Sequence, residues 1–177
     1  MTHFLASHDT AIKVTDARED KCPRPVLDKA KRDTVSKSKT GRLCLSLSST
    51  MESVGKVEAA ADKIAGEAGL DEDERFRVTM AVREAAINAI LHGNAYDPAK
   101  QIAVTFENTG KALIFTVSDQ GKGLHAEGLP DPLAPENLLR GTGRGIFLIR
   151  SFMDEVHFRE LHPGTELTLV KHLAPAG

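Results

Sequence analysis

The chain has 177 residues, of which 41% are hydrophobic and 27% charged, and its formal net charge is −2. This length suffices for one domain with a hydrophobic core and a short additional segment. The nearly balanced charge gives no electrostatic reason to expect binding to nucleic acid or to a membrane surface. No apolar run is long enough to span a bilayer, and the first residues lack the pattern of a signal peptide, so we expect a cytoplasmic protein.

Residues 1–42 carry few large apolar side chains. We expect them to form a loosely ordered N-terminal extension, followed by a single domain over residues 43–177. The segment around Cys22 resembles the Cys-Pro-x-Pro segment of small sulfur-carrier (TusA-like) proteins, but the extension has no room for the rest of such a domain. The start of a helix at the two prolines is the alternative. Cys22 and Cys44 form no disulfide framework or metal-binding pattern, so we expect free thiols.

From residue 43 onwards the hydrophobic pattern becomes regular. The alternating run LCLSLSS predicts a strand, and apolar residues at helical spacing predict a helix that ends near Gly69. Asp71 followed by Glu74 is typical of a capping box and predicts the start of a second helix, over residues 72–92.

The second half of the chain predicts four more strands and a third helix. QIAVTFE and ALIFTVS predict a hairpin, and a long loop rich in Gly and Pro follows over residues 124–141. GTGRGIFLIRSFMD then predicts a helix, and EVHFREL with TELTLVKHL a last hairpin. This order of elements predicts an α+β two-layer sandwich, with helices packed on one face of a mixed, mainly antiparallel sheet.

Within the second helix, Glu84, Asn88 and His92 are spaced by four residues among apolar side chains. Four residues turn an α-helix by about 400°, so each of these side chains lies only about 40° around the axis from the one before it. The three side chains should therefore share one narrow stripe of a largely buried helix. Buried polar groups need partners, supplied by the protein or by a ligand. The alternatives are a surface ion pair for Glu84, a satisfied amide for Asn88 and a helix-dipole position for His92. Asparagine is a weak helix former and its amide oxygen suits Mg²⁺, so Asn88 is a candidate metal ligand.

Two glycine-rich motifs follow. In GTGRG, residues 141–145, the glycines would let backbone N–H groups approach an anion at the start of the third helix. The spacing fits neither a P-loop nor a dinucleotide-binding motif, and a flexible turn is the alternative. In DQGKG, residues 119–123, Asp119 is either a turn residue or a buried carboxylate that accepts a hydrogen bond from a ligand amino group.

Together, the order ExxxN, DxGxG and GxGxG, with a long loop between the last two, resembles the GHKL (Bergerat-fold) ATP-binding domains. The resemblance covers about residues 43–173. Within that superfamily, the segments REAAINAILHGN, VSDQGKGL, GTGRGIFLIRSFMDEV and PGTELTLVK are similar to the anti-sigma-factor serine/threonine kinases of the RsbW/SpoIIAB type. The resemblance implies a Bergerat fold with ATP and Mg²⁺ as cofactors.

The resemblance also implies roles for individual residues. Asn88 would bind Mg²⁺, Glu84 would be the catalytic general base, and Asp119 would bind the adenine amino group. Residues 124–140 would form a lid over the phosphates, and His92 would be structural. The further nucleotide-binding positions would be Gly121, Gly123, Arg140, Gly141, Thr142, Gly143, Arg144, Gly145 and Thr165. Solvated side chains are the alternative for the two arginines.

By the same resemblance, the chain would be an ATP-dependent kinase that binds a sigma factor and phosphorylates an anti-anti-sigma (STAS-domain) protein. We expect a homodimer on the same grounds. One alternative is an ATP-binding regulator without kinase activity, which Glu84 argues against because pure binding needs no carboxylate there. Another is the ATP-binding part of a histidine kinase, which would need an upstream pair of helices with a phosphorylated histidine.

Overall fold

A computed structural model describes residues 33–37, 42–123 and 141–174. The predicted lid, Arg140 and most of the N-terminal extension lie outside these ranges. The helical elements are α1 (Met51–Glu67), α2 (Glu72–Asn88), the π-helical turn η1 (Ala89–Gly93) and α4 (Gly141–Phe152). The strands are β1 (Thr34–Lys37), β2 (Leu43–Ser48), β3 (Gln101–Asn108), β4 (Ala112–Ser118), β5 (Glu155–Glu160) and β6 (Thr165–His172).

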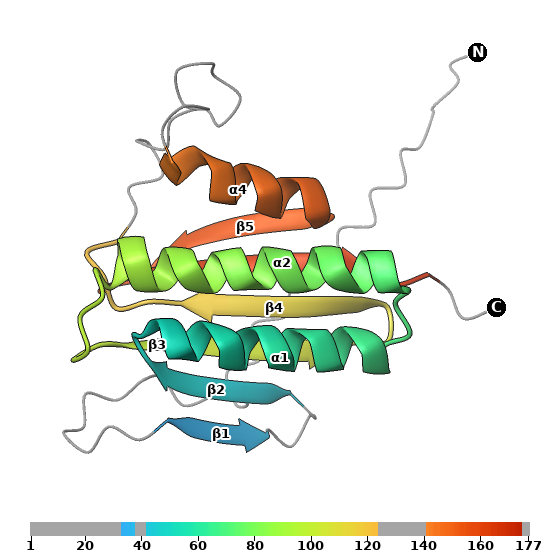
Figure 1. The fold of residues 1–177 in the computed structure, drawn as a ribbon, viewed down its shortest axis with the longest axis horizontal. Helices are drawn as coiled ribbons and strands as arrows, with labels where there is room; N and C mark the ends of the chain where they lie inside the picture. The colour runs from blue at the N-terminus through green and yellow to red at the C-terminus, as the bar shows by residue number, and fades with distance from the viewer. Residues whose placement is uncertain (1–32, 38–41, 124–140, 175–177) are drawn as a thin grey trace, which may run out of the picture.

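The six strands form one sheet in the order β1-β2-β3-β4-β6-β5, and all five neighbouring pairs are antiparallel. Helices α1, α2 and α4 cover one face of this sheet, with α2 between the other two (Figure 1). This arrangement confirms the predicted α+β two-layer sandwich, and the described strands form an antiparallel rather than a mixed sheet. None of the helices in the described ranges is long and apolar enough to cross a membrane.

The hydrophobic core lies between the helices and the sheet. Alternate residues of β3 point into it: Ile102, Val104 and Phe106 are each at most 1% exposed. Phe106 packs edge-on against Phe115 of β4, with ring centroids 5.8 Å apart and planes at 89°. Burying one such side chain stabilises the fold by about 1.5–3 kcal/mol. The period of two in the sequence therefore fixes which face of the sheet carries the helices.

The predicted start of α2 is confirmed. Asp71 is the N-cap, and its side chain accepts a hydrogen bond of 2.8 Å from the backbone N–H of Glu74. The side chain of Glu74 pairs instead with Lys171 of β6, at 3.7 Å. Gly69 follows the end of α1 with a φ of 82°, the left-handed conformation that commonly terminates helices.

Two features differ from the expectations. Thr34–Lys37, assigned to the extension, form the edge strand β1. The strand has a single large apolar residue, Val35, so its sequence shows no hydrophobic alternation. Val35 is 68% exposed in the structure. Asp33 fixes the start of this strand by accepting hydrogen bonds from the Ser48 backbone and Lys56. Cys44 of β2 is disulfide-bonded, so the expectation of a free thiol is wrong for this residue.

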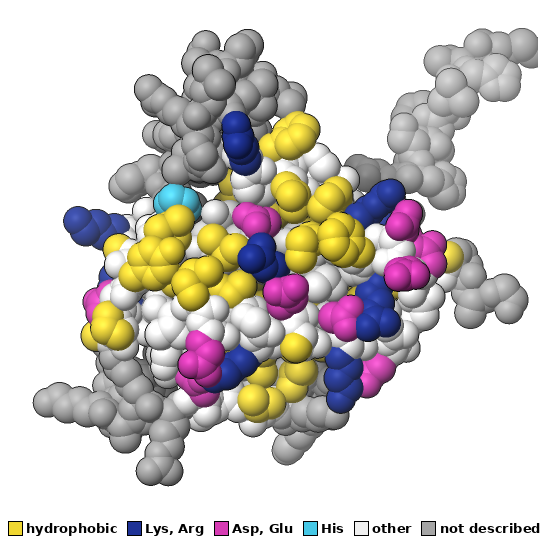
Figure 2. Space-filling model, viewed as in Figure 1, with side chains coloured by type: hydrophobic (Ala, Val, Ile, Leu, Met, Phe, Trp, Pro, Cys, Tyr) yellow, Lys and Arg dark blue, Asp and Glu magenta, His cyan; other side chains and the backbone are white. Residues whose placement is uncertain are grey.

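The outer surface of the helices combines charged and apolar side chains (Figure 2). Ion pairs join the helices across this surface, for example Arg83 of α2 with Glu58 of α1 at 3.3 Å. Phe76 of α2 and Phe147 of α4 are 60% and 44% exposed. The buried faces of these helices thus carry the core, while their outer faces are solvated.

Candidate functional site

The buried carboxylate of Asp119 lies where β4 ends and β6 begins. The residue is 8% exposed, and its Oδ1 accepts hydrogen bonds from the backbone N–H groups of Gly121 at 2.8 Å and Thr165 at 3.2 Å. Its own N–H donates to the Thr165 carbonyl at 2.9 Å. Burial raises the pKa of Asp119 above its usual value, while the two backbone hydrogen bonds act in the opposite direction. Main-chain groups therefore hold the carboxylate in one orientation.

Three glycines make room for this carboxylate. A Cβ atom on Gly93 would lie 2.5 Å from Asp119 Oδ2, and one on Gly121 would overlap the Gly93 carbonyl oxygen. A Cβ atom on Gly164 would overlap the Asp119 carbonyl oxygen. Gly121 is among the positions predicted from the sequence, whereas Gly93 and Gly164 are not. Their positions in HGN and PGTE, beside predicted site residues, are the signal that could have found them.

A second polar group forms where α2 packs against the start of α4. A Cβ atom on Gly145 would lie 3.2 Å from Glu84 Oε2 and 3.4 Å from Asn88 Nδ2. A side chain at this position would crowd the ends of both side chains, so the glycine lets the backbone of α4 approach both predicted site residues. The structure therefore brings together Glu84, Asn88 and Gly145.

The side chains of this group retain capacity for a ligand. Asn88 Nδ2 is buried and has no hydrogen-bond partner among the described residues. Glu84 has 25% of its side chain exposed, and its Oε1 lies 3.5 Å from the Arg83 guanidinium. The oxygen and nitrogen of an asparagine amide have nearly the same shape, so a rotation would present Oδ1 at the unpaired position. A partly exposed carboxylate beside an unpaired amide suits the binding of a hydrated cation.

The predicted burial of the stripe is wrong at His92. The α-helix ends at Asn88 and continues as the π-helical turn η1, whose wider winding changes the angular step between residues. His92, in this turn, is exposed, whereas Glu84 and Asn88 are partly buried. The same turn brings Gly93 against Asp119, and it therefore links the two polar groups.

Asn94, directly after η1, is not among the site residues predicted from the sequence. It is fully buried, and its Oδ1 accepts a hydrogen bond of 2.8 Å from the Gln120 backbone N–H. Its Nδ2 donates to the Gln101 carbonyl at 3.0 Å. A polar residue next to a predicted site is a weak signal, and its partners are distant in sequence.

The remaining predicted positions surround these groups. The glycines of GTGRG belong to the first turns of α4, which starts at Gly141, rather than to a loop before it. The N–H groups of a first helical turn lack partners within the helix and favour anions. Arg144 is exposed, Thr165 is buried, and Gly123 adopts a φ of 88°. The side chain of Thr142 lies outside the described part of the chain.

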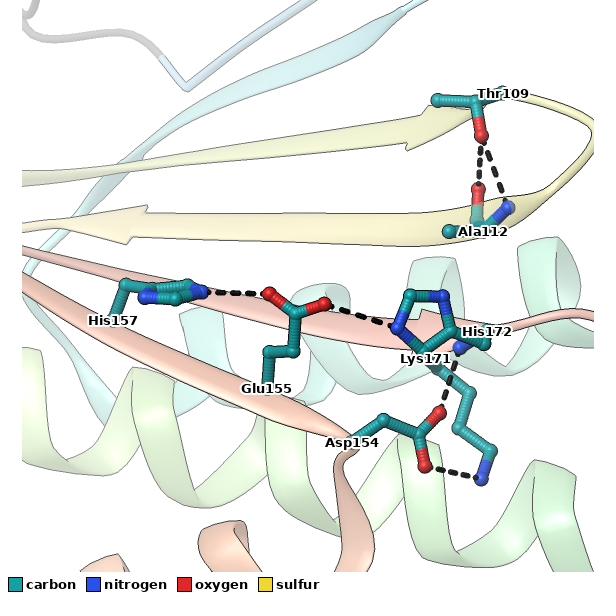
Figure 3. Close-up of polar contacts among 7 residues, drawn as sticks. All are labelled: Thr109, Ala112, Asp154, Glu155, His157, Lys171 and His172. Carbon is teal, nitrogen blue, oxygen red and sulfur yellow. Dashed lines mark hydrogen bonds and ion pairs between the residues drawn. The ribbon is translucent and has the colours of Figure 1, made fainter. Parts of the chain in front are cut away.

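Another polar cluster lies at the opposite end of the β5–β6 hairpin (Figure 3). Glu155 contacts the Nε2 atoms of His157 and His172 at 2.9 and 3.0 Å, and Asp154 contacts Lys171 at 3.3 Å. These side chains are 17–62% exposed. The seven residue steps of β6 separate His172 from Thr165 by roughly 23 Å. This cluster is therefore separate from the site around Asp119.

Comparison with known proteins agrees with this geometry. Residues 47–171 match the family model described as a histidine kinase-like ATPase domain. The chain is 35% identical to the anti-sigma F factor of Anoxybacillus flavithermus over 106 residues, which are 57% of this chain and 71% of that protein. It is 30% identical to the serine-protein kinase RsbW of Halalkalibacterium halodurans over 129 residues, which are 69% of this chain and 77% of that protein.

A solved structure shows the same fold. The structure of the RsbU and RsbW domains of Rv1364c from Mycobacterium tuberculosis matches with a TM-score of 0.56 and 22% identity. The match covers 76% of this chain and 33% of that longer chain. The described fold, the juxtaposed motif residues and these relatives lead to one conclusion: the chain belongs to the family of histidine kinase-like ATPase domains, in the group of anti-sigma factors and RsbW-type serine-protein kinases.

Proposed function

We propose that this protein is an ATP-dependent anti-sigma-factor kinase that transfers phosphate to a serine or threonine of an anti-anti-sigma (STAS-domain) protein. One observation carries the proposal: Glu84 and Asn88 meet at the backbone of α4, at Gly145. Phosphoryl transfer requires a positioned nucleophile and neutralisation of phosphate charge. A carboxylate, an amide and a helix start at one point can supply these functions.

In the proposed site, Asn88 contributes an oxygen ligand for Mg²⁺. Its unpaired, buried amide supports this role, because a buried polar group without a partner is costly unless a ligand completes it. Mg²⁺ takes few protein ligands and binds mainly through water and substrate phosphates. When bound, the ion neutralises negative charge on the phosphates of ATP.

Glu84 is the proposed general base. It would accept the proton of the substrate hydroxyl, and its partial exposure leaves it accessible to a protein substrate. Arg83 lies 3.5 Å from Glu84 and 3.3 Å from Glu58, so it restrains the carboxylate from the solvent side. Backbone N–H groups of residues 141–145 would hold the phosphates, with Arg140, Thr142 and Arg144 as further candidate contacts.

Asp119 is the proposed acceptor for the adenine amino group. Backbone N–H groups already occupy Oδ1, which leaves Oδ2, beside Gly93, for a ligand. Gly121, Gly123 and Thr165 would line the pocket for the base. The burial of Asp119 supports this role, because a hydrogen bond in a water-poor pocket discriminates strongly between ligands.

The sigma factor is proposed from the names of the relatives and from the sequence resemblance, and the STAS protein from the sequence resemblance alone. We propose a cytoplasmic homodimer on the same grounds. Residues 43–177 would form the kinase domain, to which β1 of the N-terminal extension adds an edge strand.

The test combines the purified chain with labelled ATP, Mg²⁺ and the STAS-domain protein encoded nearest in the genome. We expect label on a serine or threonine of that protein. Asn88→Ala should abolish the Mg²⁺-dependent part of nucleotide affinity, whereas Asn108→Ala, in the distant β3–β4 turn, should not. Nucleotide binding without transfer would favour the non-catalytic regulator, and label on a histidine would favour the histidine-kinase alternative. Unchanged Mg²⁺ dependence in Asn88→Ala would contradict the ligand assignment.

A further inference from the structure

Asn94 connects three segments that are far apart in the sequence. Its side chain is fully buried and uses both ends: Oδ1 accepts from the Gln120 N–H at 2.8 Å, and Nδ2 donates to the Gln101 carbonyl at 3.0 Å. The side chain of Gln120 closes the connection by accepting the Gln101 N–H at 2.8 Å. A buried amide with both ends paired rigidly fixes the segments that it joins.

The backbone around Asn94 is held in an unfavourable conformation. Ala95 and Tyr96 both have positive φ, at 53° and 55°, although neither is glycine. Such conformations cost about 1 kcal/mol or more each and persist only where surrounding contacts enforce them. Here the N–H groups of Asn94 and Tyr96 donate to the carbonyls of Ala89 and Ile90 in η1. These hydrogen bonds thus hold Asn94 directly after η1, although the backbone at Ala95 and Tyr96 is strained.

The partners of Asn94 place it beside the candidate base pocket. Gln120 is the residue after Asp119, so the hydrogen bond from its N–H to Asn94 fixes one side of the turn that carries the buried carboxylate. Gly93, the residue before Asn94, lies against the same carboxylate. Through η1, Asn94 is also six residues from Asn88, on a continuous helical segment.

We propose that Asn94 is a positioning residue for base recognition: it fixes the Asp119 turn to the end of the helix that carries Glu84 and Asn88. This inference rests on the proposed function, in which Asp119 binds the adenine amino group. The acceptor end of Asn94 is the important one, because it holds the residue adjacent to Asp119. Loss of that acceptor would let the carboxylate move relative to the base while leaving the phosphate contacts in place.

The test compares two ligands that differ only at the base. ADP and purine riboside diphosphate carry the same phosphates, but the second lacks the amino group. We expect the wild-type chain to bind ADP at least about tenfold more tightly, since a hydrogen bond to a buried charged group is worth about that factor. The ratio of the two dissociation constants is the readout, because partial unfolding or altered phosphate binding changes both constants equally.

Three variants of the full chain separate positioning from folding. Asn94→Ala should reduce the ratio to about threefold or less, a loss of roughly half of the discrimination on a logarithmic scale. Asn94→Asp keeps the acceptor for the Gln120 N–H and should keep the ratio. Any effect of its negative charge on phosphate binding changes both dissociation constants equally and cancels in their ratio. Asn108→Ala removes a similar 2.8 Å bond, from the Gly110 N–H, in the distant turn and should change nothing.

A measurement on the wild-type chain remains decisive if Asn94→Ala does not fold. Hydrogen exchange of the Gln120 amide should slow more with bound ADP than with bound purine riboside diphosphate, while that of the Gly110 amide should respond equally to both. An equal response of Gln120 to both ligands, or an unchanged ratio in folded Asn94→Ala, would overturn the inference alone. A wild-type chain that binds neither ligand would overturn the proposed function as well, and one that binds both equally would overturn the role of Asp119.

Discussion

The two ends of the β4–β6 strand pair carry polar clusters of opposite character. At one end, Asp119 is 8% exposed and is bonded by backbone N–H groups, with glycines packed against it. At the other end, Glu155 has 40% of its side chain exposed and is bonded by two histidine side chains (Figure 3). Only the first end has the burial and rigid packing that ligand discrimination requires.

The pKa values of Asp119 and Glu155 are shifted in opposite directions. Burial raises the pKa of Asp119, because desolvation disfavours its charged form. The hydrogen bond from His157 lowers the pKa of Glu155, with a further bond from His172 in the same direction. The protein therefore loses stability to keep Asp119 charged and gains a little from charged Glu155. A costly buried charge indicates function, whereas an exposed ion pair indicates surface stabilisation.

The largest effect should come from Glu84→Gln. The amide keeps the shape of the side chain but cannot accept the substrate proton, so phosphoryl transfer should fall by about 10²–10⁴-fold while ADP affinity stays nearly unchanged. Single-turnover transfer from labelled ATP to the STAS protein measures this loss. Glu58→Gln is the matched control, because it removes the other partner of Arg83 and leaves the carboxylate at Gly145 intact. Equal rates for the wild type and Glu84→Gln would remove Glu84 from the mechanism.

The next largest effect should come from adding a methyl group beside Asp119, which should lower the free energy of unfolding. Gly121→Ala should destabilise the fold by about 1–3 kcal/mol or more, because the new Cβ would overlap the Gly93 carbonyl oxygen. Gly55→Ala, on the exposed side of α1 with no atom within 4 Å of its Cβ position, should instead stabilise by about 0.5–1 kcal/mol. Urea unfolding of both variants measures the contrast. Equal free energies of unfolding would contradict the described packing around Asp119.

Asp119→Asn should weaken ADP binding by about 1–3 kcal/mol, because the amide would present a donor to the adenine amino group. It should also change the pH dependence of stability. Between the ordinary pKa of 3.8 and its raised folded-state value, the folded protein holds the Asp119 proton more tightly than the unfolded chain does. The contribution of Asp119 to stability therefore falls as the pH rises through that window.

The asparagine variant lacks this titration. Its free energy of unfolding relative to the wild type should therefore increase from pH 3.8 towards neutrality, as measured by urea unfolding at several pH values. A difference that stays constant with pH would show that Asp119 is not buried as described.

The smallest effect should come from Glu155→Gln at the exposed end. The lowered pKa of Glu155 contributes stability that is present above 4.5 and is lost as the pH falls through the folded-state value. Because the group is solvated, the loss at neutral pH should be at most about 0.2–1 kcal/mol, and ADP affinity should not change. Thermal unfolding and ADP titration check both statements. A large loss of ADP affinity would show that the two ends are coupled.

Local patterns in the sequence predicted the elements on which most of the fold depends. The alternation of Ile102, Val104 and Phe106 predicted a strand with one buried face, and Asp71 predicted the start of α2, because these signals act over a few neighbouring residues. Strand β1 was missed because its few residues are mostly polar and its stability comes from pairing with β2. The formation of β1 therefore depends on its pairing with β2, which its own residues do not predict.

The candidate site was predictable to a similar extent. The motifs named Glu84, Asn88, Asp119 and Gly145, since each contributes a chemically distinctive side chain or glycine. The contacts of Asn94 join residues up to 26 positions apart, and no local pattern encodes such a distance. The change from α- to π-helical winding at Ala89 has no signal in the apolar periodicity, and that periodicity did not predict the exposure of His92.

The turn η1 has a consequence for the tolerance of this segment to insertions and deletions. One end of the helical segment is tied to β6 through Glu74 and Lys171, and the other is tied to β4 where Gly93 lies against Asp119. Removing one residue between Asn88 and Gly93 would favour ordinary α-helical winding, in which the four remaining steps turn the chain by about 400°, nearly as far as the five steps of the wider π-helical winding. Gly93 would therefore stay beside the carboxylate. The turn therefore tolerates the loss of this one residue, whereas an insertion or deletion in the α-helical part of α2 would rotate Gly93 away from Asp119 by about 100°.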